Sequence, residues 1–204
     1  MLKTFSRILN GYQNFRKKYV VENNTLLHKL AKHGQKPEIM IVACCDSRVD
    51  PALLLQCDPG DLFVLRNVAN IVPPYENDEA HHGTSAALEF GICYLNIKHL
   101  IILGHSQCGG IHALLNQQQL QQDDFISNWI NLIKINANTS QETDACAKEA
   151  LLTSYKNCLT FPWLKEKIAQ NKLSLNLWFF EIQEGVIYNY SSEKKTFLPL
   201  DTEL

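Results

Sequence analysis

The sequence predicts an α/β fold with a central, mostly parallel sheet flanked by helices. Short, continuous apolar runs at 39–43 and 100–103 are typical of strands buried on both faces. Helical patterns separate these runs, and strands that alternate with helices favour a parallel sheet. We expect about four parallel strands and an antiparallel edge strand, preceded by an N-terminal helical arm.

The arm covers residues 1–34. Its first 21 residues mix basic and apolar side chains, with no acidic residue before Glu22. This pattern predicts an amphipathic helix that docks on the body or on a partner subunit, and we prefer this reading to a transit peptide. A second helix is expected at 25–33, with Gly34 as its stop. The apolar residues of the first helix are Leu2, Phe5, Ile8, Leu9, Tyr12 and Phe15.

The remaining elements follow in order along the chain. After the strand at 39–43, Asp50 is a helix N-cap and Pro51 a first helical residue, which opens a helix at 52–56. Further strands are expected at 61–65, 99–103 and 173–182, and an antiparallel partner at 186–190. Further helices are expected at 84–95, 110–115, 123–136 and 142–158. The Gln- and Asn-rich stretch 116–122 is expected to be a polar helix end or loop.

The composition is that of an ordinary globular protein. Of 204 residues, 46% are hydrophobic and 20% are charged, and 19 basic against 21 acidic residues give a net charge of −2. This balance creates no field that favours nucleic acid. The apolar runs are too short to span a bilayer. We therefore expect a single domain over residues 1–204 that binds neither nucleic acid nor a membrane.

Seven cysteines occur at irregular spacing. An odd number with no secretory signal argues against a disulfide framework and favours the reducing cytoplasm. In that compartment, cysteines serve as core fillers, metal ligands or nucleophiles. Cys45 is expected to be a core thiol.

Two motifs follow predicted parallel strands, at the edge where open α/β sheets place their ligands. The first is Cys44-x-Asp46-Ser47-Arg48, after the strand at 39–43, and the second is His105-Ser106-x-Cys108-Gly109-Gly110, after the strand at 99–103. The first motif is expected by chance only about 0.0003 times in a chain of this composition. Convergence of the two loops would bring Cys44, His105 and Cys108 together.

Two thiolates and one imidazole are suitable zinc ligands, and three protein ligands leave a position for water. A closed structural site would need a fourth Cys or His, and the sequence has no second C-x-x-C or H-x-x-C to supply it. The open site is therefore favoured. Asp46 would either coordinate the metal or accept a hydrogen bond from its water, while Arg48 holds that carboxylate bidentately. A loop salt bridge without a chemical role is the alternative for this pair.

The two motifs resemble those of the β-class carbonic anhydrases. The likeness extends from about Gln35 to Gly110 and includes the stretches 63–70 and 83–90; it is looser at 177–190. It implies one Zn²⁺ per chain on Cys44, His105 and Cys108, with Asp46 and Arg48 as a dyad. Gln35 and Phe63 match the plant-like, open-site subgroup. The subgroup's pocket Tyr falls on Phe90, and Ile41 stands where the bicarbonate-inhibited subgroup has Trp.

The resemblance implies the reversible hydration of CO2 to bicarbonate and a proton, through attack by zinc-bound hydroxide. Asp46 would orient the reacting water, and Phe63 and Phe90 would line an apolar substrate pocket. Gln35 and the backbone N–H of Gly109, where a side chain would obstruct, would donate hydrogen bonds to the substrate oxygens.

Two further expectations concern assembly and pH. The resemblance implies a homodimer, or a tetramer of such dimers, with each active site at a subunit boundary and the N-terminal helix reaching across. If Arg48 released Asp46 at low pH, the carboxylate would occupy the fourth zinc position in a closed state.

Three other functions are weighed against this one. Hydrolysis of CS2 or carbonyl sulfide would use the same metal with a differently gated pocket. A non-catalytic, zinc-stabilised domain would have a closed site. A thiol phosphatase is disfavoured because its Cys-x5-Arg loop is missing: Arg48 is four residues after Cys44 and three after Cys45.

Overall fold

The computed structural model describes residues 2–22, 24–116, 120–121, 124–136 and 141–200. Within these residues, six strands form one sheet in the order β2-β1-β3-β4-β5-β6. The first four strands in this order pair in parallel, and β5 and β6 are antiparallel. The strands are β1 (Ile39–Cys44), β2 (Leu62–Asn67), β3 (His99–His105), β4 (Ser174–Glu181), β5 (Val186–Ser191) and β6 (Thr196–Pro199).

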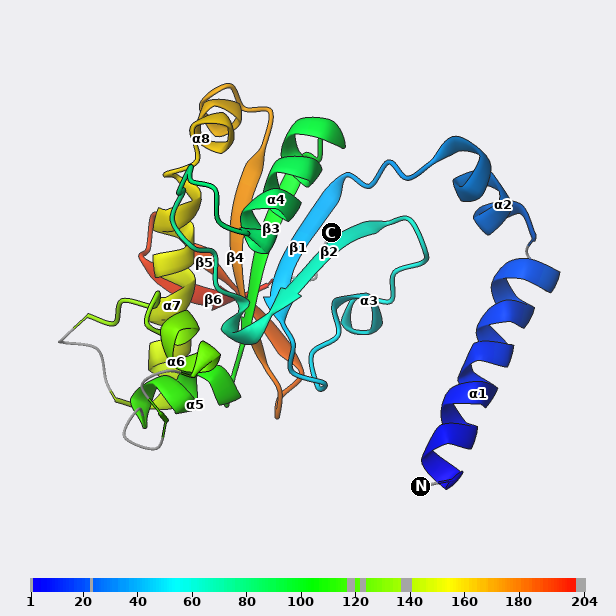
Figure 1. Cartoon of the computed structure of the whole chain (residues 1–204), viewed down its shortest axis with the longest axis horizontal. Helices are drawn as coiled ribbons and strands as arrows, with labels where there is room; N and C mark the ends of the chain where they lie inside the picture. Colours follow the sequence, from blue (N-terminus) through cyan, green and yellow to red (C-terminus); the bar gives the residue numbers. More distant parts are fainter. Residues whose placement is uncertain (1, 23, 117–119, 122–123, 137–140, 201–204) are drawn as a thin grey trace.

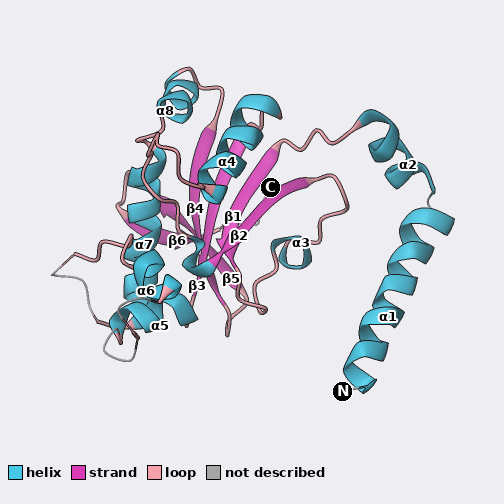
Figure 2. Cartoon of the chain, viewed as in Figure 1, coloured by secondary structure: helices cyan, strands magenta, loops and turns pink. Residues whose placement is uncertain are grey.

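Helices surround this sheet (Figure 2). The α-helices are α1 (Leu2–Arg16), α2 (Asn24–His33), α3 (Pro51–Leu54), α4 (Gly83–Glu89), α5 (Gly109–Leu115), α6 (Phe125–Ile130), α7 (Thr143–Cys158) and α8 (Pro162–Ala169). Two π-helical segments, Lys17–Glu22 and Phe90–Tyr94, continue α1 and α4. A short 3-10 turn, Val68–Asn70, follows β2. The predicted fold class is therefore confirmed, and the expected N-terminal helices are present.

The structure differs from the prediction at three elements. The sheet has a second antiparallel strand, β6, whose four residues are too few for a periodic pattern to reveal. Helix α8 was not predicted, although Pro162 at its first turn is a recognised start signal. The helix expected at 123–136 is only α6 (Phe125–Ile130) in the described residues. Residues 117–119 and 122–123 of the predicted polar stretch and helix lie outside the described part.

The shortening of α6 has a tertiary cause. Beyond Ile130, the chain packs against the core instead of continuing the helix, and Ile133 is buried. The Thr153 hydroxyl, on α7, donates a hydrogen bond of 3.0 Å to the Lys134 carbonyl. Burial of apolar side chains along a non-helical path thus outweighs a helical pattern in the sequence.

Strand β1 is the centre of the core. Its residues from Met40 to Cys44 are buried, as expected for a parallel strand covered on both faces. Its neighbours are β2 on one side and β3 on the other. The connection from β1 to β2 therefore runs across the sheet in the opposite direction to the connection from β2 to β3, and the order of the strands reverses between β1 and β3. In α/β sheets such a switch point leaves a crevice at the carboxyl ends of the strands. Ala43 pairs with Leu103, which places Cys44 and His105 at this crevice.

The N-terminal arm touches the rest of the chain near Asp58, whose Oδ1 accepts from Lys18 Nζ at 3.3 Å, and near Gly60, which lies against Leu30. Figure 1 shows α1 and α2 extending away from the sheet, in the blue part of the sequence. Large apolar side chains of the arm are exposed, Phe5 by 64% and Ile8 by 60%. Helix α2 ends as predicted: Gly34 has φ +75°, and its N–H donates to the Leu30 carbonyl. Among the described helices, we find none whose length and apolar character would suit a membrane crossing.

Candidate metal centre

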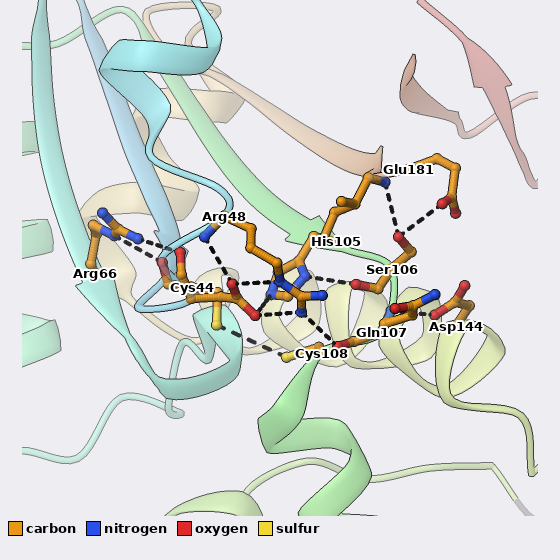
Figure 3. Close-up of polar contacts among 11 residues, drawn as sticks. Cys44, Arg48, Arg66, His105, Ser106, Gln107, Cys108, Asp144 and Glu181 are labelled. Carbon is orange, nitrogen blue, oxygen red and sulfur yellow. Dashed lines mark hydrogen bonds and ion pairs between the residues drawn. The ribbon is translucent and has the colours of Figure 1, made fainter. Parts of the chain in front are cut away.

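Three buried side chains meet where β1 and β3 end. The ligand atoms of Cys44, His105 and Cys108 all lie within 4.8 Å of one another. Cys44 is the last residue of β1, His105 is the last residue of β3, and Cys108 is the N-cap of α5. The Sγ atoms of Cys44 and Cys108 are 3.9 Å apart (Figure 3). The structure thus brings together the three residues that the two motifs singled out as ligands.

His105 presents one ring nitrogen to this cluster. Its Nδ1 lies 2.8 Å from the Ser106 carbonyl oxygen, which only accepts, so Nδ1 carries the proton. Nε2 therefore has a free lone pair. The side chain is 0% exposed and Nε2 has no hydrogen-bond partner. A buried nitrogen without a partner is costly, and a bound metal ion would satisfy it. The donor set of two sulfurs and one nitrogen fits zinc.

The two thiols share their protons unequally. The hydrogen bond from Cys108 lowers the pKa of Cys44, so a first proton is lost readily. The same contact, together with burial, raises the pKa of Cys108, because a second ionisation would place two thiolates side by side. A divalent cation between the sulfurs would remove this repulsion.

Asp46 and Arg48 form a bidentate pair beside the cluster. Arg48 Nε donates to Asp46 Oδ1 at 3.0 Å and Arg48 Nη2 donates to Asp46 Oδ2 at 2.7 Å. The Arg48 backbone N–H also donates to Oδ1, at 2.9 Å. The Arg48 guanidinium holds the pKa of the Asp46 carboxyl well below its usual range. Asp46 Oδ2 lies 3.9 Å from His105 Nε2, so an ionised carboxylate faces the free lone pair.

Arg66 fixes the backbone of the first motif. Its guanidinium donates to the carbonyls of Cys44, at 2.9 Å, and Asp46, at 2.7 Å. It also makes a 2.7 Å ion pair with Asp50, whose other carboxylate oxygen caps α3 by accepting from the Leu53 N–H. Arg66 thus takes part in a structural ion pair. Its hold on the Cys44 and Asp46 carbonyls was not predicted.

The second motif is held by two acidic residues that the sequence did not single out. The Ser106 hydroxyl donates to Glu181 at 3.0 Å, and the Ser106 N–H donates to the Phe180 carbonyl. The Gln107 N–H donates to Asp144 Oδ1 at 2.7 Å (Figure 3). Glu181 and Asp144 are 75 and 37 residues from their partners. No local spacing signals such contacts.

Three of the expected pocket residues, Gln35, Phe63 and Phe90, lie away from the cluster of their own chain. Phe63 pairs with Met40, whereas Asn67, four residues later, pairs with Cys44. At about 3.3 Å per residue, this offset is about 13 Å. Phe90, 45% exposed, lies beside Phe63 with ring centroids 5.9 Å apart. Gln35 precedes β1, whereas Cys44 is the last residue of β1, so Gln35 lies beyond the other end of this strand.

One expectation at a neighbouring position was wrong. Cys45 is exposed and is not a core thiol. A Cβ built on Gly109 would meet no atom of this chain within 4 Å, and the expectation that a side chain there would obstruct the substrate stays a prediction. The crowded glycine is Gly110, whose Cβ would come within 2.8 Å of Val68 and 2.9 Å of Ala69. Close approach of α5 to the turn after β2 therefore requires glycine at 110.

A second group of metal-binding side chain types lies at the surface. It consists of Glu76, Asp78 and His82. His82 Nε2 is already hydrogen bonded to Asp78 Oδ1 at 2.6 Å. This group therefore lacks the unpartnered, buried nitrogen that distinguishes the first cluster.

Comparison with known proteins agrees with this geometry. The family model described as carbonic anhydrase matches residues 39–187. A carbonic anhydrase of Synechocystis sp. is 35% identical over 203 residues, covering 94% of this chain and 73% of the relative. The structure of the β-carbonic anhydrase CcaA superposes with a TM-score of 0.87 at 33% identity, covering 97% of this chain and 100% of that one.

A tetrameric β-carbonic anhydrase of the ascomycete Sordaria macrospora is also similar. Its structure has a TM-score of 0.75 at 29% identity, with 92% of this chain and 96% of that chain covered. The family match spans both motifs and the four parallel strands β1 to β4. The predicted resemblance is thus confirmed, and the chain belongs to the β-class carbonic anhydrase family.

Proposed function

We propose that the chain carries out the reaction of its family, the reversible hydration of CO2 to bicarbonate and a proton, at one zinc ion held by Cys44, His105 and Cys108. The observation that carries this assignment is the buried lone pair of His105 Nε2. It has no hydrogen-bond partner and lies with two cysteine sulfurs in one cluster of ligand atoms. When bound, zinc supplies a Lewis acid that makes water a nucleophile near neutral pH.

The Ser106 carbonyl determines how His105 binds. By accepting the Nδ1 proton, it fixes the tautomer that offers Nε2 to the metal. The two thiolates reduce the net charge of the site compared with a site of three neutral histidines. We therefore expect a higher pKa for the reacting water than the value of about 7 typical of three-histidine sites.

Asp46 orients the reacting water in this proposal. Because Arg48 keeps the carboxylate ionised, Oδ2 can accept a hydrogen bond from an O–H group of the water but cannot donate one. Hydrogen bonding to Oδ2 would direct a lone pair of the water oxygen towards CO2. Both oxygens of Asp46 are held by Arg48, which keeps the carboxylate from the fourth ligand position. This pairing supports the open-site subgroup.

A second copy of the chain would complete the substrate pocket. Gln35, Phe63 and Phe90 are too far from the cluster of their own chain, yet Phe90 is exposed and available to a partner. The exposed apolar side of α1 also needs a cover, and burial on a second copy would supply it. We propose a homodimer, or a tetramer of dimers, in which these residues and the Gly109 N–H line a shared pocket.

The state of the cysteines supports a reducing location. All seven cysteines lie in the described residues, and none of them forms a disulfide. We propose the cytoplasm, where thiols stay reduced.

The test combines metal analysis with stopped-flow CO2 hydration. Wild-type protein should hold one zinc per chain and hydrate CO2. Cys108→Ser should lose zinc and activity, whereas Cys45→Ser, at the exposed neighbour of Cys44, should keep both. Asp46→Asn should keep zinc and lose most of the activity. Full activity in Asp46→Asn would remove the dyad from the mechanism, and zinc retained in Cys108→Ser would contradict the ligand set.

The other functions gain no support. Among the described side chains, no fourth His, Cys, Asp or Glu joins the three-residue cluster, as a closed structural site would require. The relatives described above are carbonic anhydrases, not CS2 or carbonyl sulfide hydrolases.

A further inference from the structure

The geometry points to Asp144 as a positioning residue for the reaction: from the first turn of α7 it holds the Gln107 peptide in place, and through this peptide it orients Arg48. The inference rests on the proposed function of the Asp46–Arg48 pair. Asp144 itself does not belong to the ligand cluster. Its role would be to determine where the guanidinium stands, and hence where Asp46 points.

The first contact joins α7 to the second motif. Gln107 lies between His105 and Cys108 and adopts φ +53°, in the left-handed region that is unfavourable for a residue with a Cβ. A tertiary contact has to offset this cost. Asp144 Oδ1 accepts from the Gln107 N–H at 2.7 Å, a short hydrogen bond to a carboxylate.

The second contact joins Gln107 to the dyad. The Gln107 carbonyl accepts from Arg48 Nη2 at 3.1 Å, and the same Nη2 donates to Asp46 Oδ2 at 2.7 Å (Figure 3). The N–H and the carbonyl of Gln107 belong to successive peptide planes, whose relative orientation depends on φ and ψ of this residue. Holding the N–H in place therefore restricts rotation at Gln107 and limits the directions that the carbonyl can take. Rotation at Gln107 would remove the acceptor that keeps Nη2 beside Asp46.

The rest of the loop is anchored without Asp144. Ser106 is tied to β4 by its N–H on Phe180 and by its hydroxyl on Glu181. Cys108 begins α5, where its carbonyl accepts from the His112 N–H. Loss of Asp144 should therefore disturb the Gln107 peptide while the ligand residues on either side stay in place. This separates the positioning of Arg48 from the binding of zinc.

The contact needs an acceptor and not a charge. An asparagine at 144 can offer its amide oxygen to the Gln107 N–H, whereas an alanine cannot. Asp144 also lies in the first turn of α7, where a negative charge stabilises the helix. Asparagine removes this charge as well, so if Asp144 only stabilised the helix, kcat/KM would fall in both variants. If Asp144 positions the Gln107 peptide, kcat/KM should fall only in the alanine variant.

The experiment compares zinc-loaded wild type, Asp144→Ala, Asp144→Asn, Arg48→Ala and the double variant Asp144→Ala/Arg48→Ala. Lys156→Ala, at the exposed far end of α7, is the control. Zinc content, kcat/KM for CO2 hydration and the water exchange of the Arg48 Nε–H, followed by ¹⁵N NMR, are measured. The exchange rate reports on the hydrogen bond to Asp46 independently of turnover.

We expect Asp144→Ala to keep one zinc per chain, lower kcat/KM about tenfold and accelerate exchange at Arg48 Nε. Asp144→Asn and Lys156→Ala should stay within about twofold of wild type in both readouts. In the Arg48→Ala background, Asp144→Ala should cause no further loss, because the residue through which it acts is gone.

Four outcomes would overturn the inference: multiplicative losses in the double variant, equal losses in Asp144→Ala and Asp144→Asn, zinc loss in Asp144→Ala, or unchanged activity and exchange in Asp144→Ala. Failure of the proposed function looks different. If Arg48→Ala retains full activity, the dyad itself is dispensable, while exchange at Arg48 Nε in the other variants still reports whether Asp144 positions the guanidinium.

Discussion

Replacing Arg48 by lysine isolates the geometry of the dyad from its charge. Arg48 now makes two side-chain hydrogen bonds to Asp46, from Nε at 3.0 Å and from Nη2 at 2.7 Å, and a third to the Gln107 carbonyl at 3.1 Å. A lysine ammonium is a single point charge and cannot span both carboxylate oxygens as the planar guanidinium does. Arg48→Lys therefore keeps the positive charge and loses at least one charge-assisted hydrogen bond.

The size of the effect follows from these contacts. A hydrogen bond to a charged group contributes about 1.5–3 kcal/mol, and partial solvent screening reduces this. Because the Arg48 side chain is 44% exposed, we take about 1–2 kcal/mol for the lost contact. If this energy is lost in the transition state, kcat/KM falls by about 5- to 30-fold. Zinc content should not change, because Arg48 is not in the ligand cluster.

The assay is stopped-flow CO2 hydration with a pH indicator on protein whose zinc content has been measured. Activity of Arg48→Lys within twofold of wild type at full zinc occupancy would refute the claim that bidentate geometry matters. Loss of zinc in the variant would also refute it, since the dyad would then be supporting the ligands.

The remaining predictions concern pH, packing and assembly. Arg48 depresses the pKa of Asp46, so this pair stabilises the fold above the ordinary Asp value of about 3.9, and the stabilisation is lost as the pH falls through the lower folded-state value. Urea unfolding should therefore show a constant difference in the free energy of unfolding between wild type and Asp46→Asn from pH 8 to 5. A difference that changes over this range would contradict the argument. For the same reason, a closed acid state would require the Asp46–Arg48 pair to separate, since Asp46 is ionised at pH 5; crystals grown at acid and alkaline pH with the same Asp46 position in both would argue against it. Gly110→Ala should lower the free energy of unfolding by about 1–3 kcal/mol because its Cβ would clash with Val68 and Ala69, whereas Gly109→Ala, with open space, should change it much less; equal thermal shifts would disprove the packing argument. Changing Phe5, Ile8 and Phe15 to serine should halve the mass measured by light scattering if α1 covers a second copy, and an unchanged mass would exclude the arm from the interface.

Local patterns were sufficient for much of the fold. The apolar run of β1 predicts a central strand because burial on both faces demands continuous apolar residues. Asp50 and Pro51 predict the start of α3, and the Asp50 carboxylate indeed accepts from the Leu53 N–H. Local patterns failed where an element was too short to show a period, or where tertiary packing determined the path of the chain. Strand β6 has four residues, and the chain after Ile130 follows the core instead of its helical pattern.

The candidate site divides in the same way. Both motifs follow apolar strands, and parallel strands deliver their carboxyl ends to one edge of a sheet, so the sequence was enough to predict that Cys44 and His105 would meet. It was not enough to predict the hold of Asp144 on Gln107 or that of Glu181 on Ser106. These hydrogen bonds join residues from different elements, and no spacing within either segment encodes them.

The sequence by itself therefore determined the family, the order of the main strands and the donor atoms available for a metal, because these depend on residue type and local periodicity. Only the tertiary structure decided that the His105 lone pair is left without a partner and that both oxygens of Asp46 are held by Arg48. It also decided that Phe63 lies far along β2 from the cluster of its own chain, with Phe90 beside it. The physical reason is that hydrogen bonding and burial depend on where separate elements come to rest against one another.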